Sequence, residues 1–150
     1  MEINSSGRFQ RLKAVCVITH GGDYLFSVGV DPLDQRIFLV PVGGGIEFGE
    51  LALTAAVREA REKIGVDVEN PHLLGVLENI FAYKGETDHE VVFCFIGQVR
   101  SRESVPLEGV ESDGISFPLR WLSEGELRSP DVPVYPEGIL DLILNDLDGD

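Results

Sequence analysis

Cysteine is scarce in this chain, and neither copy stands where a reactive or metal-binding thiol is expected. The 150 residues include 2 cysteines, Cys16 and Cys94, which lie in the apolar runs "AVCVI" and "VVFCF". A cysteine in such a run usually behaves as a small buried hydrophobe, so no disulfide framework is expected. Two free thiols favour a reducing compartment, and we expect a cytoplasmic location.

Positive charge is also scarce. Lys and Arg together number 12 against 26 Asp and Glu, which gives a formal net charge of -14. Because a phosphate backbone is attracted mainly by clustered Lys and Arg, nucleic acid is not an expected partner. Part of the acidity could serve to bind divalent cations, although dispersed carboxylates that keep a surface soluble explain most of it.

Long hydrophobic runs are missing as well. No apolar stretch approaches the roughly 20 residues that a membrane-spanning helix needs, and the N-terminal residues lack the pattern of a secretory signal. With 43% hydrophobic residues, the chain is long enough to bury one core. We therefore expect one domain over residues 1–150, with no membrane partner.

Short apolar runs bounded by turn residues predict strands before and after a central helix. The run "KGETDH" between two of them is typical of a hairpin loop. Helical periodicity covers residues 50–64 and the run "PEGILDLILNDL", where Pro136 suits a first helical turn, and "SEGEL" could add a short helix. This order predicts an α/β fold with a mixed sheet and helices on both faces. The predicted strands are "KAVCVI", "YLFSVGV", "RIFLVPV", "LLGVLENIFAY", "HEVVFCFIGQV" and "FPLRWLS".

The central helix carries both an apolar stripe and a pair of acids. Glu59 and Glu62, at i and i+3, are expected to project together from the side opposite the stripe. Gly65 is expected to end the helix in a left-handed conformation, whereas Leu51 is a poor residue to cap its start. The stripe that we expect to face the core is Leu53, Val57, Ala60 and Ile64.

These two carboxylates, with Glu50 at the entrance of the helix, form a patch of hard oxygen ligands suited to Mg²⁺ or Mn²⁺. The glycines before them let a metal or a phosphate approach the backbone closely. The plainer alternative is a solvated helix face with an Arg58–Glu62 pair at i and i+4, which is the usual explanation of a Glu-rich helix.

The spacing of the whole segment favours the metal site. Gly44, five residues, Glu50, seven residues and then "REAREKIGV" resembles the Nudix box, a pattern of 23 positions that is far more specific than a lone glycine motif. The flanking segments "GVLENIFAYKG", "HEVVFCF", "LRWLS" and "YPEGILDL" resemble a Nudix subgroup whose box begins "GGGIEFGE". The resemblance implies a Nudix-type α/β/α sandwich with a mixed sheet.

The same resemblance implies a hydrolase that cleaves the diphosphate linkage of a small nucleoside diphosphate derivative with Mg²⁺ or Mn²⁺. In the positions of this chain, Glu59, Glu62 and the Gly43 carbonyl would bind the metal. Arg58 would orient the carboxylates, and Glu50 would support them from outside. A homodimer is common among such proteins and is expected here.

Further residues are implied as contacts of the substrate or as an additional acid. Gly44, Gly45 and Lys63 would lie against the substrate. These enzymes often recruit a later glutamate as ligand or general base; Glu90 is our candidate and Glu78 the reserve. A surface charge on a strand explains either one equally well.

Lys63 departs from the box, which has a glutamate at this position. An ammonium there removes an oxygen donor and repels a bound cation. One outcome is that Lys63 extends away or contacts a substrate phosphate, and hydrolysis is retained in a weakened or narrowed form. The other is that Lys63 pairs with Glu59 at i and i+4 and converts the fold to a nucleotide-binding or regulatory module.

Overall fold

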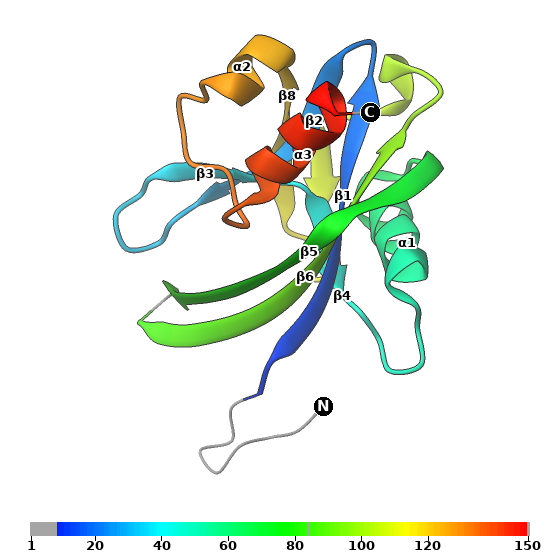
Figure 1. The fold of residues 1–150 in the computed structure, drawn as a ribbon. Helices are drawn as coiled ribbons and strands as arrows, with labels where there is room; N and C mark the ends of the chain where they lie inside the picture. Colours follow the sequence, from blue (N-terminus) through cyan, green and yellow to red (C-terminus); the bar gives the residue numbers. More distant parts are fainter. Residues whose placement is uncertain (1–8, 84, 150) are drawn as a thin grey trace.

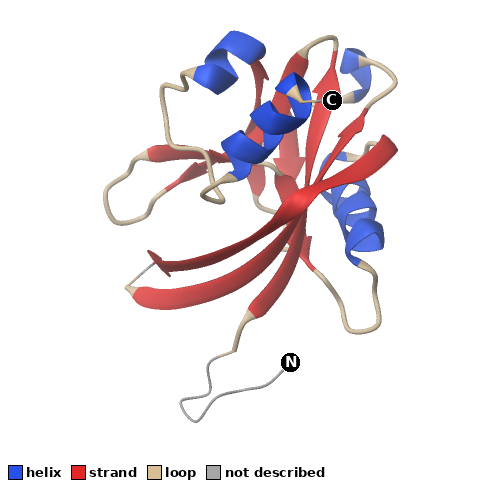
Figure 2. Ribbon diagram, viewed as in Figure 1, coloured by secondary structure: helices blue, strands red, loops and turns tan. Residues whose placement is uncertain are grey.

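Eight strands form one mixed sheet in the computed structural model, which describes residues 9–83 and 85–149. Helix α1 (Ala52–Ile64) covers one face, and helices α2 (Glu124–Arg128) and α3 (Ile139–Asp148) cover the other (Figures 1 and 2). The predicted α/β/α sandwich is confirmed. Within the described residues no helix is long and apolar enough to span a bilayer.

The central part of the sheet has the order β5-β6-β1-β2-β8-β7, with β3 added to β2 and β4 added to β1. Strands β1 and β6 run parallel and the other pairs are antiparallel, so the sheet is mixed. The strands are β1 (Arg11–His20), β2 (Asp23–Val30), β3 (Ile37–Val40), β4 (Val42–Gly45), β5 (Glu69–Tyr83), β6 (Glu86–Gln98), β7 (Glu108–Val110) and β8 (Ser116–Ser123), and a 3-10 turn covers Arg102–Ser104.

Strands β1 and β2 separate along their length. They pair only from Ile18 to His20, opposite Asp23–Leu25. Beyond that point β1 pairs with β4 and β2 pairs with β3. The sheet is therefore split between the two strand pairs, and the split opens next to the start of β4, where Val42 pairs with Cys16.

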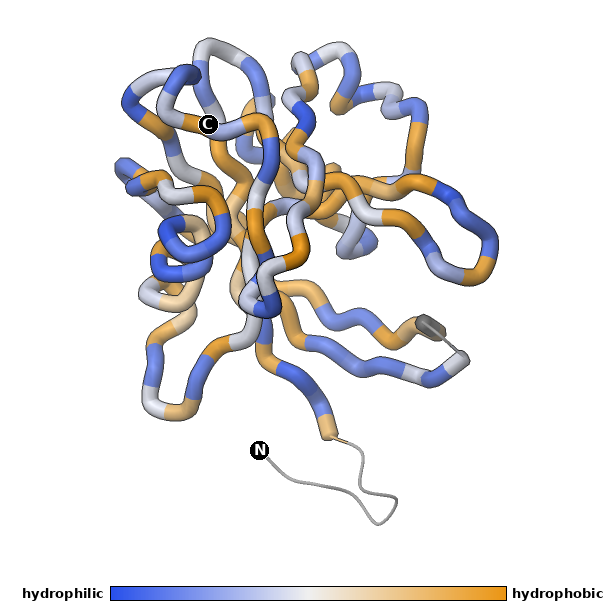
Figure 3. Tube along the Cα trace, turned by 180° about the vertical axis from the view of Figure 1, so that it is seen from behind, coloured by the Kyte–Doolittle hydropathy of each residue, from blue (hydrophilic) through white to orange (hydrophobic). Residues whose placement is uncertain are grey.

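Two hydrophobic clusters pack on the two faces of the sheet. Along β1, Cys16 and Ile18 belong to the cluster under α1, whereas Val15 and Val17 belong to the cluster under α3. This alternation follows from the two-residue period of a strand. In Figure 3 the hydrophobic colour is concentrated along the central strands, and the outer turns of α1 are hydrophilic.

Several predicted elements have different boundaries in the structure. The run "RIFLVPV" is divided at Pro41 into β3 and β4, which pair with different strands. Helix α3 begins after Gly138, so the prediction that Pro136 lies in its first turn was wrong. Strand β5 ends at Tyr83 as predicted but begins earlier, at Glu69. Strand β6 begins at Glu86, because backbone pairing continues through residues that we assigned to the loop.

Both cysteines are free and buried, as predicted. Burial raises the pKa of each thiol, Cys16 and Cys94, to about 12. The reactive thiolate is therefore nearly absent at neutral pH. We expect neither cysteine to react with a disulfide reagent such as DTNB in the folded protein, and both to react in denaturant. Rapid labelling of the folded protein would contradict this.

Candidate functional site

Helix α1 carries the site and lies close to the sheet because its buried face is made largely of alanine. Ala55, Ala56 and Ala60 are buried with Ile64 at its end. Leu51, the N-cap residue, makes no side-chain hydrogen bond to the first turn of the helix. The loop before it is stabilised by the Glu50 carboxylate, which accepts a hydrogen bond of 3.0 Å from the Glu47 N–H.

The end of α1 is also as expected, but its buried face is not. Gly65 adopts the left-handed conformation and donates its N–H to the Arg61 carbonyl. The prediction that Leu53 faces the core and Glu59 the opposite side was wrong, since Leu53 is 42% exposed and Glu59 only 9%. Because the alanines face the sheet, Glu59 lies on the same buried side of the helix. A carboxylate therefore lies at the edge of the core.

Gly44 makes room for this buried carboxylate. A Cβ atom at Gly44 would lie 2.5 to 2.6 Å from the three carboxyl atoms of Glu59. No side chain could occupy that space without displacing the acid. The glycine of strand β4 and the glutamate of α1 are therefore in direct contact, backbone against carboxylate.

Arg58 connects the acids of the site. Its Nε and Nη2 donate to the two Glu50 oxygens at 2.7 and 2.9 Å, a paired geometry. Its Nη1 donates to Glu59 at 3.0 Å and to Glu62 at 2.9 Å, and Nη2 also donates to the Gly45 carbonyl at 3.0 Å. Charge-assisted bonds of this kind are short and strong, so Arg58 holds three carboxylates and the glycine strand in one arrangement.

This network shifts the pKa values of its members. The hydrogen bond from Arg58 is the main cause that lowers the pKa of Glu50 to about 2. The bond to Glu50 is likewise the main cause that raises the pKa of Arg58, with Glu62 and Glu59 contributing. Both groups are therefore charged at neutral pH.

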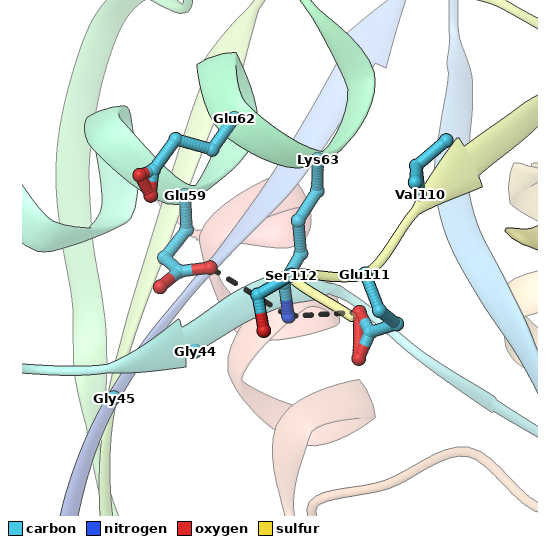
Figure 4. A pocket seen from close by; sticks show the side chains of 8 residues that line it. All are labelled: Gly44, Gly45, Glu59, Glu62, Lys63, Val110, Glu111 and Ser112. Carbon is cyan, nitrogen blue, oxygen red and sulfur yellow. Dashed lines mark ion pairs between the residues drawn. The ribbon is translucent and has the colours of Figure 1, made fainter. Parts of the chain in front are cut away.

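Lys63 is directed into the site. Its Nζ donates to the Gly43 carbonyl at 2.5 Å and lies 3.1 Å from Glu111 Oε1 and 3.6 Å from Glu59 Oε1. Figure 4 shows the ammonium between the two carboxylates. The i, i+4 pair with Glu59 is the contact that we expected for a binding module, whereas Glu111 was not expected.

A pocket of about 470 Å³ opens beside these side chains. It brings together five of the predicted site residues and three that we missed, which come from β7 and the turn after it. Nothing in "LEGVESDG" distinguishes Glu111 from an ordinary loop acid, because its contact with α1 depends on how β7 packs. The lining is Gly44, Gly45, Glu59, Glu62, Lys63, Val110, Glu111 and Ser112.

A second pocket of about 280 Å³ lies where the sheet is split. It shares Lys63 and Glu111 with the first pocket, and Gly43, whose carbonyl accepts the hydrogen bond from Lys63, also lines it. The rest of its wall is mainly apolar, with a few polar groups. This part of the lining includes Val15, Val28, Phe38, Val40, Val42 and Phe117, together with Lys13, Ser27 and Ser116.

Glu90, our candidate for an additional acid, is paired with a lysine of β1. Its carboxylate lies 3.4 Å from Lys13 Nζ and is 12% exposed, and it does not line the first pocket. Its partner Lys13 does line the second pocket. Glu78 is exposed on β5 and lines neither pocket.

The oxygen donors fit a hard divalent cation, although they are engaged with cationic side chains. In residues 9–83 and 85–149, no group of three or more His, Cys, Asp and Glu side chains is placed to hold a metal. Arg58 binds Glu59 and Glu62, and Lys63 pairs with Glu59. Proteins commonly hold Mg²⁺ with one or two carboxylates plus substrate phosphates, however, and Glu59 and Glu62 suffice for that.

Comparison with known proteins agrees with this geometry. The chain matches the model of the NUDIX domain over residues 11–142. It is similar to a NUDIX hydrolase from Nitrosomonas europaea, with 24% identity over 94% of this chain and 90% of that one and a TM-score of 0.70. A MutT NUDIX hydrolase from Burkholderia pseudomallei has 23% identity, coverages of 91% and 98%, and a TM-score of 0.66. At such identities the solved structures support the fold.

The contact between Gly44 and Glu59 can be tested by stability. We expect Gly44→Ala to lower the free energy of unfolding by about 1 to 3 kcal/mol, because the methyl group must displace the buried carboxylate. Gly45→Ala is the matched control, since a Cβ there meets open space. Urea denaturation measures both. Equal stability of the two variants would mean that Glu59 does not lie against Gly44.

The Arg58–Glu50 pair predicts a dependence of stability on pH. The pKa of Glu50 is lowered from 4.5 to about 2 in the folded protein. Its contribution to stability is therefore present above pH 4.5 and is lost as the pH falls toward 2. We expect the difference in unfolding free energy between wild type and Glu50→Gln to shrink over that range.

Denaturation at a series of pH values measures this difference. Glu47→Gln is the control for the loss of one charge from the same loop, since its carboxylate is exposed and lies 3.9 Å from Arg58 Nη1. A wild-type advantage over Glu50→Gln that is the same at all pH values would contradict the prediction.

Proposed function

Because this chain belongs to the NUDIX family, we propose that it is a pyrophosphohydrolase that cleaves the phosphoanhydride bond of a nucleoside diphosphate joined to another group. NUDIX enzymes generally act on small nucleotide derivatives and use a divalent metal such as Mg²⁺. The observation that supports the proposal most is the gathering of Glu59, Glu62 and Lys63 around one open pocket beside the glycines of β4.

A bound divalent cation would neutralise charge on the diphosphate and lower the pKa of an attacking water. Glu59 and Glu62 would hold it, whereas the Gly43 carbonyl, which the resemblance implied as a further ligand, accepts a hydrogen bond from Lys63. Gly44 and Gly45 leave the backbone open to the substrate, because they place no side chain in the pocket.

Arg58 would position these carboxylates during binding. Its two bonds to Glu50 form a bidentate pair that does not involve the pocket acids. Glu59 and Glu62 can therefore turn toward a cation while Arg58 stays anchored. This gives Glu50 its role, which is to hold the arginine and not to bind the metal.

The second pocket would receive the nucleoside portion of the substrate. Its mainly apolar wall suits a flat base, and it meets the first pocket at Lys63 and Glu111. Lys13 adds a positive charge to this wall. Glu90 stays our candidate for the additional glutamate from a later strand, because its partner Lys13 lines the second pocket.

A binding module that does not cleave its ligand is the second candidate. The observation that favours it is the 3.6 Å pair between Lys63 and Glu59, since an occupied Glu59 is less available to a cation. We favour hydrolysis because Glu62 is available to a cation. Within the described residues its carboxylate is hydrogen-bonded only to Arg58, and its side chain is about half exposed.

Product analysis with a panel of nucleotides tests the proposal. We expect cleavage of at least one nucleoside triphosphate, ADP-ribose, dinucleotide cofactor or nucleotide sugar, with dependence on Mg²⁺ or Mn²⁺ and loss with chelator. Glu59→Gln and Glu62→Gln should lower kcat about 100-fold or more, because they remove ligands. Arg58→Gln should lower it about 10- to 100-fold, as the loss of an outer partner does.

Glu124→Gln is the control, since Glu124 lies on α2 on the opposite face of the sheet and pairs with Arg128. Its activity should equal that of wild type. A chain that binds one of these compounds by calorimetry, yet converts none of them with any metal, would favour the binding module.

A further inference from the structure

The ammonium of Lys63 lies within a set of oxygen atoms. The Gly43 carbonyl is 2.5 Å away, Glu111 Oε1 is 3.1 Å away and Glu59 Oε1 is 3.6 Å away. The Gly43 carbonyl accepts a hydrogen bond from the ammonium, and the two carboxylates compensate its charge as ion pairs. The side chain is only 19% exposed, which places the charge inside the site and not at its rim.

The same set of oxygens suits a hard cation. A backbone carbonyl and carboxylates are the ligands that Mg²⁺ and Mn²⁺ bind in proteins. Since Lys63 Nζ already lies among them, a divalent ion cannot occupy this point without displacing it. An ammonium and a divalent cation that contact the same oxygen atoms would repel each other strongly, because water is partly excluded from the site.

The fold holds the Gly43 carbonyl and the backbone of Glu111 in fixed positions. Gly43 pairs with Val15 in the sheet, and a side chain at Gly43 would meet the backbone of Ala14 and Val15, so its carbonyl has little freedom. Glu111 opens a closed turn, in which its N–H donates to the Ile115 carbonyl at 2.8 Å and its carbonyl accepts from Gly114 at 2.9 Å. These oxygen atoms therefore form a preorganised site for one cation.

We propose that Lys63 is a built-in cation of the active site, held by Gly43, Glu59 and Glu111 at a point where a divalent ion would otherwise bind. The site then takes one divalent ion fewer than it would with a glutamate at position 63. Its role in catalysis rests on the proposed function: the ammonium would contact a phosphate oxygen in the pocket once Gly43 and Glu111 release it in part. The count of bound ions does not depend on that role.

Counting bound Mn²⁺ tests this inference. The number of ions per chain is measured by electron paramagnetic resonance in the absence of nucleotide, for the full chain and its variants. We expect Lys63→Glu to bind about one Mn²⁺ per chain more than wild type, because it replaces the ammonium with an oxygen donor. Arg61→Glu is the matched control, with the same charge change on the same helix but outside the pocket, and its count should equal that of wild type.

A second pair of variants locates the additional ion. Glu111→Gln in the Lys63→Glu background should weaken the gained Mn²⁺ at least about tenfold, because Glu111 would be one of its ligands. If Lys63→Glu does not fold, as judged by circular dichroism, Lys63→Gln carries the same test. It removes the ammonium and should allow Mn²⁺ to bind the freed oxygens, again in dependence on Glu111.

Three results would overturn the inference: no gain of Mn²⁺ in the position 63 variant that folds, an equal gain in Arg61→Glu, or a gain that Glu111→Gln does not weaken. Failure of the proposed function is seen separately, as absence of nucleotide cleavage. A chain without hydrolysis whose Lys63→Glu variant still gains a Glu111-dependent ion would keep the inference and lose the function.

Discussion

The carboxylate of Glu59, buried at the edge of the core, is the constraint on which the site depends. A buried charge is tolerated only where cationic groups and hydrogen bonds compensate for it. Arg58 donates to one of its oxygens and Lys63 lies near the other. Gly44 leaves the space in which the acid lies. The alanine face of α1 then brings this helix near enough to the sheet for these contacts to form.

Charge balance also determines what the site can accept. Arg58 and Lys63 are already paired with the acids around them. An incoming diphosphate therefore needs an additional positive charge to compensate its own charge. A divalent ion on Glu59 and Glu62 would supply it, and would free part of the hydrogen bonding of Arg58. Lys63 can turn toward a phosphate only if Glu111 and Gly43 release it in part. Binding of metal and of substrate should therefore be coupled through these two cationic side chains.

The sequence was informative where contacts are local. Glu59, Glu62 and Lys63 lie within two turns of one helix, and the box spacing places them beside Gly44, so their meeting could be predicted. Glu111 could not be, because its contact with Lys63 depends on the packing of β7, an element of three residues without an apolar pattern. The burial of Glu59 was missed for a related reason: hydrophobic periodicity favours Leu53 and Val57, whereas close packing favours the alanines and is revealed only by the glycine strand opposite them.

Lys63 and Glu111 are best understood together. With a glutamate at position 63, the pocket would gather that acid, Glu59 and Glu111 around the Gly43 carbonyl, with only the Arg58 bond to Glu59 to compensate them among the described residues. Such a set would need a metal ion to be stable. With lysine, the same oxygens are compensated by the chain itself, and Glu62 together with Glu59, which takes part in both arrangements, would hold an ion shared with substrate phosphates. The departure from the box is therefore matched by a residue outside it, Glu111, which pairs with the lysine.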